Sequence, residues 1–582
     1  MLRVKSTAMR RVALPAAIAL VAAAFGVTPA QAAETFPNAT FSGSATGTVL
    51  HTDELNSGTT RIENSDVALS SAAVNSRRLT NQQLNENSRV INPALPTKSA
   101  YAKGQGLEVG LAQAPTTDGQ ILTAGKAEAS APPTGPTVTR ETPVNADPVA
   151  FASLVRGRAD ARWNDETCIL GTDMTRGLGY AADVQLVDAG GNTKPGELDM
   201  PLVALDGSAP ARAASQSVSR NKLVPNADGS FGLLSEVRET IAPVTLFKGA
   251  PTQLTIEVLG EWVLRAVATG APGPRDEKLF YGPANKNPET PILRVTNGLT
   301  APTTTLLTFQ EVFGGTGFTI PGLDAVAEIA IGEDPRMIGG NAATQPVVAA
   351  DGTQVAAAVD IVRIKLLGGV GGDIRIGHME VRAIVPAGGV ICPIPVTKVA
   401  TPSTVNETTA PDGKFQVAIT VRNPYDCPLT NVRVVDVITR KSGNVTFEIV
   451  KDDPRNNPKA GEAGGTTFTN SSPTSATATY PNLGTIAPGG TLVVNLVIRV
   501  LSGGGEIQDI VTVNGVLNCP DARAQGEARA SAALSGSFTL ITRANALLPR
   551  TGGGESLIWL GLPLAALLVG RRITKSERRP QG

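Results

Sequence analysis

The run Phe415-Gln416-Val417-Ala418-Ile419-Thr420-Val421-Arg422 decides the fold class of this chain. Large apolar residues occupy every second position, and smaller or polar residues stand between them. A period of two places alternate side chains on opposite faces of a β-strand, so this run predicts a strand buried on one face. Its flanks, Pro411-Asp412-Gly413 and Asn423-Pro424, are turn sequences.

The same alternation recurs along the chain, together with many short runs of Thr and Val, and predicts an all-β protein. The clearest further strands are Leu254–Val258, Val362–Leu366 and Leu492–Val500, with shorter ones at Thr46–Leu50, Leu107–Leu111 and Val511–Val513. In Asp373–Ala383 the apolar phase reverses at Gly377, and a β-bulge there would keep both halves on one buried face. One short helix is predicted over Thr305–Phe313.

Turn signals and changes in composition divide the chain into a large β-rich domain, 33–395, and a β-sandwich of about seven strands, 396–530. A proline-rich connector spans about 132–148, and the sequence leaves open whether it separates two domains or crosses one sandwich. Residues 531–547, rich in Ala, Ser and Thr, are expected to form a short spacer.

The N-terminus has the composition of a secretory signal peptide. Four basic residues precede the alanine-rich apolar stretch Val12–Val27, and the small residues Ala30 and Ala32 follow where a signal peptidase would cut. We therefore expect residues 1–32 to be removed on export.

The C-terminus, 548–582, carries a second processing signal. Leu548-Pro549-Arg550-Thr551-Gly552 precedes the uncharged apolar segment 557–569 and a tail with five basic residues. At about 1.5 Å per residue the apolar segment is short for a transmembrane helix, and the basic tail would hold it at the cytoplasmic face of the membrane.

This order of elements resembles the cell-wall sorting signal of Gram-positive bacteria, in which a sortase recognises Leu-Pro-any-Thr-Gly. The resemblance implies cleavage between Thr551 and Gly552 and covalent attachment of Thr551 to peptidoglycan. Sortase would be a transient partner, and contact with the membrane would be limited to the C-terminal segment before cleavage.

Residues 396–530 also resemble a known module. The runs Ala418–Pro424, Leu429–Asp436 and Leu483–Gly490 look like the conserved-repeat, immunoglobulin-like module of prokaryotic surface proteins. Residues 33–395 resemble the large N-terminal part of actinobacterial wall-anchored surface proteins. Both resemblances imply architecture and location at the cell surface rather than a reaction.

Charge excludes some classes of partner. The whole chain is neutral, with 51 basic and 51 acidic residues. Residues 1–32 carry a net charge of +4 and residues 552–582 a net charge of +3, so the processed chain has a net charge of −7. This excess of acid argues against nucleic acid or anionic lipid as a partner.

The four cysteines of an exported chain are expected to form disulfides. Three pairings of Cys168, Cys392, Cys427 and Cys519 are possible. We favour Cys168–Cys392 and Cys427–Cys519 because this pairing keeps each bridge within one predicted domain. No Cys-x-x-Cys spacing indicates zinc, and neither a metal nor a cofactor is expected.

Signals for catalysis are weak. The two histidines, His51 and His378, are predicted to be solvated, and no Gly-x-Ser-x-Gly or His-Glu-x-x-His motif occurs. Asp165-Glu166, beside Trp163 and Cys168, is interpreted as a turn next to a disulfide. Asn226–Gly229 is an ordinary turn with too few oxygen ligands for calcium. We therefore expect a protein that is not an enzyme.

Two features keep a pilus interpretation open. Lys398 and Asn514, on the first and last predicted strands of 396–530, are placed as in pilin-like domains that carry a lysine–asparagine isopeptide bond, with Asp436 as the acid. Glu407–Gly413 resembles the Glu-box of sortase-assembled pilins, although its position fits a loop of the repeat module.

The sequence thus predicts an exported protein anchored to the wall of a Gram-positive bacterium, with a role in adhesion or envelope structure and an unidentified extracellular ligand. A sortase-polymerised pilus component and a wall-anchored polysaccharide hydrolase are the alternatives.

Overall fold

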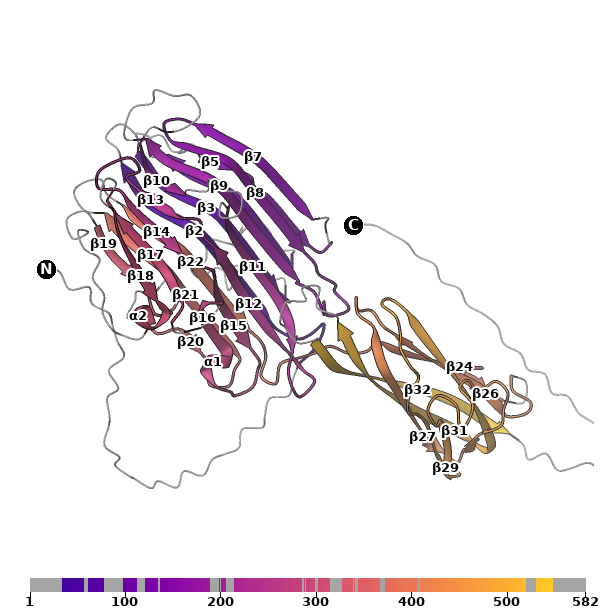
Figure 1. Cartoon of the computed structure of the whole chain (residues 1–582). Coiled ribbons are helices and arrows are strands. Elements are labelled where there is room, and N and C mark those ends of the chain that lie inside the picture. Colours follow the sequence, from indigo (N-terminus) through magenta and orange to yellow (C-terminus); the bar gives the residue numbers. More distant parts are fainter. Residues whose placement is uncertain are drawn as a thin grey trace, which may run out of the picture.

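The computed structural model describes residues 34–56, 61–77, 98–111, 121–133, 137–188, 200–205, 214–284, 289–298, 302–313, 327–338, 344–366, 372–406, 409–519 and 530–547, with a few single residues between them. The segments predicted to be a signal peptide, 1–32, and a sorting signal, 548–582, lie outside these residues. The described residues form 32 strands and two short helices, so the chain is all-β. Figure 1 shows a broad N-terminal sandwich, with a narrower C-terminal sandwich extending from one end.

The N-terminal sandwich consists of two sheets, here called sheet A and sheet B. Sheet A contains β1 (Glu34–Thr35), β7 (Val138–Ala146), β8 (Ala150–Ala161), β9 (Thr175–Asp188), β10 (Pro201–Leu205), β11 (Ala214–Pro225), β12 (Phe231–Thr240), β13 (Val244–Leu246), β14 (Leu254–Val258), β15 (Glu261–Ala268), β16 (Leu279–Pro283), β17 (Pro291–Asn297), β18 (Thr303–Thr308) and β23 (Val390–Ile391). Sheet B contains β2 (Ser42–Asn56), β3 (Arg61–Asn75), β4 (Ala100–Leu111), β5 (Ile121–Ala124), β6 (Ala127–Ala131), β19 (Ala327–Ile331), β20 (Val347–Val348), β21 (Gln354–Leu366) and β22 (Asp373–Ile384).

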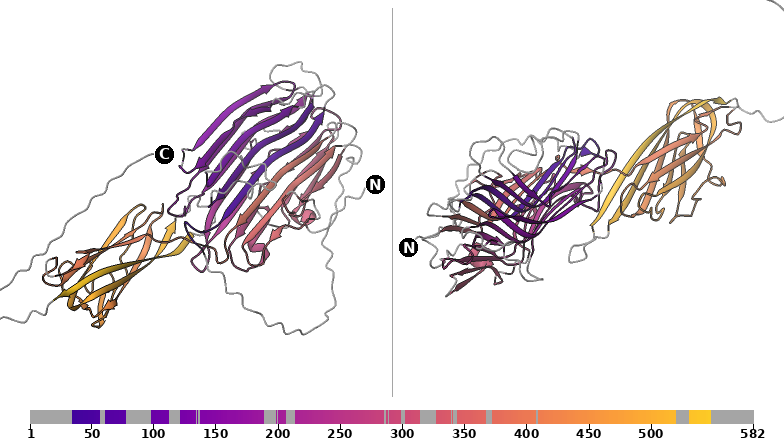
Figure 2. Two further views of the ribbon diagram at one scale, coloured as in Figure 1. Left: turned by 180° about the vertical axis from the view of Figure 1, so that it is seen from behind. Right: turned by 90° about the horizontal axis from the view of Figure 1, so that it is seen from above.

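Small residues set the distance between these two sheets. A Cβ atom on Gly177 of β9 would lie 2.3 Å from the carbonyl oxygen of Lys103 on β4, so the facing backbones touch. Cα atoms of β3 and β9 approach within 8 Å, closer than the roughly 10 Å usual between stacked sheets. Figure 2 shows the two sheets stacked face to face.

The proline-rich connector crosses one sandwich rather than separating two domains. Most of it, Val138–Ala146, is itself β7 of sheet A, which follows β6 of sheet B in the chain and pairs with β8. The N-terminal sandwich also includes the two helices, α1 (Arg275–Lys278) and α2 (Phe309–Phe313). The helix predicted over Thr305–Phe313 is therefore only half correct, because residues 303–308 form β18.

The β-bulge expected at Gly377 is not formed, because the pairs on either side of it keep one register and no residue is inserted; the alternation reverses through the conformation of Gly377 itself. Gly377 has φ +68°, and β22 pairs with β2 on either side of it, at Ile376↔Leu50 and His378↔Thr48. Ile376 and Met379 are both fully buried, as a shared inner face requires. A residue in the left-handed region shifts the alternation by one, and glycine adopts that conformation without a Cβ clash.

The C-terminal sandwich contains nine strands: β24 (Val396–Thr401), β25 (Thr404–Val405), β26 (Lys414–Arg422), β27 (Leu429–Gly443), β28 (Thr446–Ile449), β29 (Thr467–Ser472), β30 (Ser475–Tyr480), β31 (Thr491–Cys519) and β32 (Ala530–Leu547). The long β31 belongs to both faces. Its first half pairs with β26 and β28, and its second half with β27 and β32.

Two expectations about the end of this sandwich were wrong. Residues 531–547 are not a spacer but belong to β32, which pairs with β31 from Gly503↔Leu547 to Cys519↔Ala530. Val511–Val513 is accordingly not the last strand but an inner part of β31. Small residues with weak strand propensity become a strand here because a long neighbour supplies the backbone partners.

Candidate functional site

The described part of the chain contains two disulfides, one in each sandwich. Cys168 pairs with Cys392, and Cys427 pairs with Cys519. The two sandwiches meet at the second bridge, because a Cβ atom on Gly171 would lie 2.5 Å from Sγ of Cys427. Disulfides of this kind belong to proteins of oxidising compartments, so this chain is extracellular or secreted.

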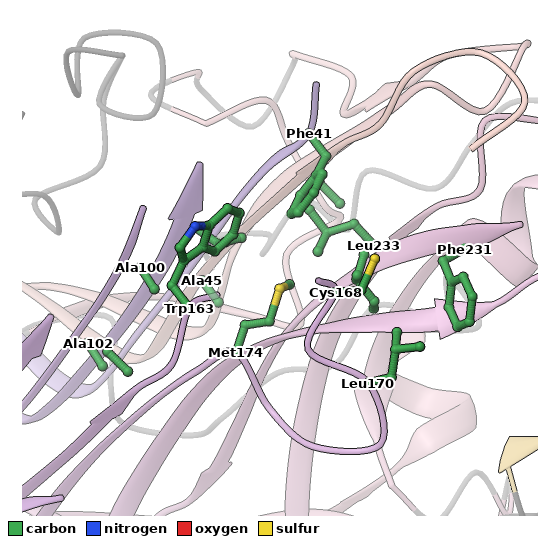
Figure 3. Close-up of a cluster of buried hydrophobic side chains, with 14 of the residues drawn as sticks. Phe41, Ala45, Ala100, Ala102, Trp163, Cys168, Leu170, Met174, Phe231 and Leu233 are labelled. Carbon is green, nitrogen blue, oxygen red and sulfur yellow. The ribbon is translucent and has the colours of Figure 1, made fainter. Parts of the chain in front are cut away.

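The acidic pair beside Trp163 is part of a packed turn. Trp163 lies with its ring centroid 5.9 Å from those of Phe36 and Phe41, and its indole N–H donates to Asp165 at 3.0 Å. Figure 3 shows Trp163 and Phe41 in the buried cluster that also contains Cys168. Asp165 is thus engaged in holding the indole, which agrees with the structural interpretation of this turn.

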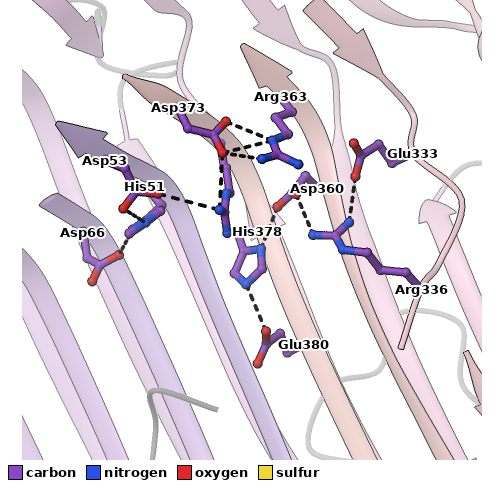
Figure 4. A network of polar contacts seen from close by, with 11 residues as sticks. His51, Asp53, Asp66, Glu333, Arg336, Asp360, Arg363, Asp373, His378 and Glu380 are labelled. Carbon is purple, nitrogen blue, oxygen red and sulfur yellow. Dashed lines mark hydrogen bonds and ion pairs between the residues drawn. The ribbon is translucent and has the colours of Figure 1, made fainter. Parts of the chain in front are cut away.

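The main cluster of charged side chains lies on the outer face of sheet B. Gly47 of β2 faces sheet A, since a Cβ there would lie 2.3 Å from Oγ of Ser217 on β11. The next residue, Thr48, therefore points away from sheet A, and it is paired with His378, which is paired with Asp360. Figure 4 shows the cluster, here called the histidine network. It consists of His51, Asp53, Asp66, Glu333, Arg336, Asp360, Arg363, Asp373, Arg375, His378 and Glu380.

His51 is buried between two carboxylates. Its Nδ1 lies 2.7 Å from Asp66 of β3, and its Nε2 lies 3.0 Å from Asp53 of its own strand. Only 2% of the residue is exposed, so the prediction that His51 is solvated was wrong. The sequence shows Asp53 two positions away, but the pairing of β2 with β3 is needed to bring Asp66 beside the ring.

His378 has a similar arrangement. Its Nδ1 lies 2.6 Å from Asp360 of β21 and its Nε2 lies 3.3 Å from Glu380. The side chain is 17% exposed, so the prediction of a solvated histidine was wrong here too. Burial by itself would lower the pKa of His378, but the charge of Asp360 and the hydrogen bonds to Asp360 and Glu380 outweigh it and raise the pKa to about 10.

Arginines complete the network. Arg336 donates to Asp360 and to Glu333, both at 2.7 Å, and together with His378 it holds the pKa of the buried Asp360 below its ordinary value despite the opposing effect of burial. Arg375 lies 3.3 Å from Asp373 and 3.6 Å from Asp53, which connects the carboxylates around His51 to Asp373 and its partner Arg363.

These contacts restrict the chemistry available to the network. A general base must be deprotonated near the working pH, whereas His378 with a pKa of about 10 remains a cation at neutral pH. Among the described residues no three His, Cys, Asp or Glu side chains are grouped to hold a metal ion. As arranged, the network links four strands of sheet B, β2, β3, β21 and β22, through ion pairs and hydrogen bonds.

The candidate calcium turn is closed by its own side chains. Asp228 accepts hydrogen bonds from the backbone N–H and the hydroxyl of Ser230, and Asn226 donates to the carbonyl oxygen of Thr269. This is an Asx-type turn, as expected from Asn226–Gly229.

Lys398 contacts the expected acid, Asp436, but not the expected asparagine. Its Nζ contacts the carboxylates of Asp436 on β27 and Asp509 on β31, and all three side chains are almost completely buried. Asn514 is not its partner: it is paired with Arg433. The pairing of Lys398 with Asn514 is thus corrected to two aspartates. The missed signal is an acid in the inward phase of Ile507, Asp509, Val511 and Val513.

The other pilus signal, Glu407–Gly413, is only partly described. Residues 407 and 408 lie outside the described part, and residues 409–413 form the turn before β26. This placement agrees with the loop interpretation.

No helix in the described part of the chain is long and apolar enough to span a membrane. The apolar segment 557–569 is not among these residues.

Comparisons with known proteins give no family for this chain. No protein-family model matches it, and no curated protein does. The structure described as AvmM, which catalyses macrocyclization in alchivemycin A biosynthesis, matches at 9% identity and a TM-score of 0.16 over 28% of this chain and 92% of that one. Escherichia coli α-2-macroglobulin activated by porcine elastase matches at 11% identity and a TM-score of 0.14 over 87% of this chain and 41% of that one. The native conformation of the same protein matches at 10% identity and a TM-score of 0.16, over 87% and 38%. This chain therefore spans less than half of the macroglobulin chains.

Proposed function

We propose that this chain is an exported surface protein that sortase attaches to peptidoglycan, and that it has a non-enzymatic role in adhesion or envelope structure. The sorting sequence carries the proposal: Leu548–Gly552, the apolar segment 557–569 and the basic tail follow one another at the end of the chain. The signal peptide, 1–32, and the two disulfides support an extracellular destination.

The arrangement of the sandwiches supports this role. β32 ends at Leu547, one residue before the sorting motif. After cleavage at Thr551 the C-terminal sandwich would be held within a few residues of the wall, and the N-terminal sandwich would be presented outward. The ligand of a surface protein of this kind would meet the N-terminal sandwich first.

Anchoring is tested by comparing two variants of the motif. Thr551→Ala removes the residue whose carbonyl carbon would be joined to the wall, whereas Arg550→Ala changes the position at which any residue is accepted. We expect muramidase to release the wild type and Arg550→Ala from washed walls, and Thr551→Ala to be found in the medium or the membrane fraction. Muramidase-dependent release of Thr551→Ala at the wild-type level would contradict the proposal.

The same wall extracts distinguish the alternatives. A singly anchored protein gives one released species on a denaturing gel, whereas a sortase-polymerised pilus gives a ladder of high-mass species. Screening the purified chain against wall and plant glycans tests the hydrolase alternative, for which turnover would be the deciding result.

A further inference from the structure

The interior of the C-terminal sandwich contains a lysine that faces two carboxylates. Lys398 lies on β24, on one face of the sandwich, and Asp436 and Asp509 lie on β27 and β31, on the other face. The exposed fractions of the three side chains are 0%, 0% and 2%. On the strands that carry the acids, the inward neighbours Ile438 and Val511 are completely buried and apolar, so the cluster is kept from water.

The charges of Lys398, Asp436 and Asp509 limit the protonation states that this buried cluster can adopt. One ammonium group and two carboxylates would leave an uncompensated negative charge in an apolar interior, which is costly. A neutral cluster has one further proton, shared between the two carboxylates. Burial first, and the charge of Asp509 next, raise the pKa of Asp436 well above its ordinary value, which agrees with a proton held by this carboxylate pair. The same neutral cluster can exist as an uncharged amine and two carboxylic acids.

The lysine approaches the two acids differently. Nζ of Lys398 donates a hydrogen bond to Oδ1 of Asp436. It also contacts Oδ1 of Asp509, but neither oxygen of Asp509 lies in hydrogen-bond geometry with a donor in the described part of the chain. Nζ thus donates a hydrogen bond to Asp436 and contacts Asp509 without one.

We propose that Nζ of Lys398 condenses with the carboxyl group of Asp509 to form an intramolecular isopeptide bond, with Asp436 as the proton carrier. The ammonium first passes a proton to the carboxylate pair, and the neutral amine then attacks Cγ of the protonated Asp509. Asp436 transfers the amine proton to the departing hydroxyl oxygen. The N–Cγ bond forms, a Cγ–O bond breaks and one water molecule leaves, so the step requires no oxidant and no energy source beyond the fold.

The bond would cross the sandwich between strands that are not neighbours. β26 lies between β24 and the first half of β31, and Asp509 is in the second half of β31, on the opposite face. Cys427–Cys519 already connects the turn before β27 to the end of β31. The isopeptide bond would add a covalent connection that reducing agents do not break, and it does not depend on whether the chain is anchored to a wall.

The test is the mass of one pair of peptides from the full-length chain. After reduction, alkylation and digestion with trypsin, we expect Ala383–Lys414, uncut at Lys398, to be joined to Val500–Arg523 and to be one water lighter than the two together. Separate peptides with cleavage after Lys398 would overturn the proposal. A link to Val434–Arg440, which contains Asp436, would overturn the assignment of the two acids.

Variants test the role of each residue. We expect Lys398→Arg and Asp436→Asn to give the uncoupled peptide Val500–Arg523. Lys441→Arg is the matched control, because Lys441 is an exposed lysine on β27 that pairs with Glu506 of β31. It should retain the link. The mass of the wild-type peptides tests the proposal even if a variant fails to fold. A link that persists in Asp436→Asn would contradict the role of Asp436 as the proton carrier.

Discussion

Gly104 of β4 and Gly157 of β8 meet across the N-terminal sandwich with no side chain between them. A Cβ atom on Gly157 would lie 2.1 Å from the carbonyl oxygen of Gly104, and one on Gly104 would lie 2.5 Å from the carbonyl oxygen of Arg158. The two strands thus pack backbone against backbone, and the spacing of sheets A and B depends on glycine at this point.

Gly157→Ala should therefore destabilise the N-terminal sandwich. The added methyl group has no space and must push the sheets apart, which typically costs about 1–3 kcal/mol. Calorimetric unfolding of the full-length chain measures the effect. Gly135→Ala is the control, because the nearest atom to a Cβ at that position is 4.0 Å away. Equal melting temperatures for the two variants would contradict the close packing.

His378 should make the stability of the N-terminal sandwich depend on pH in the alkaline range. Its pKa is raised from about 6.5 in the unfolded chain to about 10 in the fold, mainly by Asp360 acting against burial. The stabilisation is complete below pH 6.5 and is lost as the pH rises through 10. We expect the stability difference between the wild type and His378→Gln to shrink across this window. Thermal unfolding between pH 6 and 10 measures it, and a constant difference would show that the charge of His378 is not involved.

Glu239 should also make the N-terminal sandwich less stable as the pH rises, but over a lower pH range than His378. It is buried against Gly47, its Oε1 accepts from Ser217 at 3.0 Å, and burial raises its pKa to about 8. A raised carboxyl pKa stabilises the fold below the unfolded value of about 4.5, and this contribution is lost as the pH rises through 8.

Glu239→Gln removes that titration while keeping the size of the side chain. We expect the variant to be more stable than the wild type at pH 9, by on the order of a few kcal/mol, and the gain to disappear near pH 5. Urea unfolding at the two pH values measures the difference. A gain of equal size at both pH values would point to packing rather than to charge.

Deletion of residues 531–547 should unfold the C-terminal sandwich. These residues form nearly all of β32, whose loss leaves the second half of β31 without one of its neighbours. We expect the unfolding transition of this sandwich to be lost in calorimetry while that of the N-terminal sandwich remains. Arg543→Ala, at a side chain that is 74% exposed on the same strand, is the control. An unchanged transition after the deletion would restore the spacer interpretation.

The positions of most strands follow from local sequence. Phe415–Arg422 and Leu254–Val258 alternate strictly, and each forms a strand with its apolar residues buried. The reversal of apolar phase at Gly377 is also readable, but the structure achieves it with a left-handed glycine and without the inserted residue of a β-bulge. β32 could not be found in this way, since its alanines and serines acquire strand structure only by pairing with β31.

Periodicity states which side of a strand a residue occupies but not what faces it. His378 does lie on the outer face of β22, yet Asp360 and Arg336, from other segments of the chain, make it a half-buried cation rather than a solvated base. Likewise, the sequence predicted that Lys398 would pair with Asn514 on the last strand. In the structure the register of β31 and the stacking of the two faces place Asp509, rather than Asn514, against Lys398.

The sequence by itself thus determined the all-β class, because alternation is a local property, and it carries the proposed processing signals, which a protease or sortase would read in an extended peptide. Only the tertiary structure decided which charges meet: the partners of His51, His378 and Lys398 come from strands brought together by pairing and stacking. Burial then sets the protonation of these groups, and through it the chemistry that each cluster can perform.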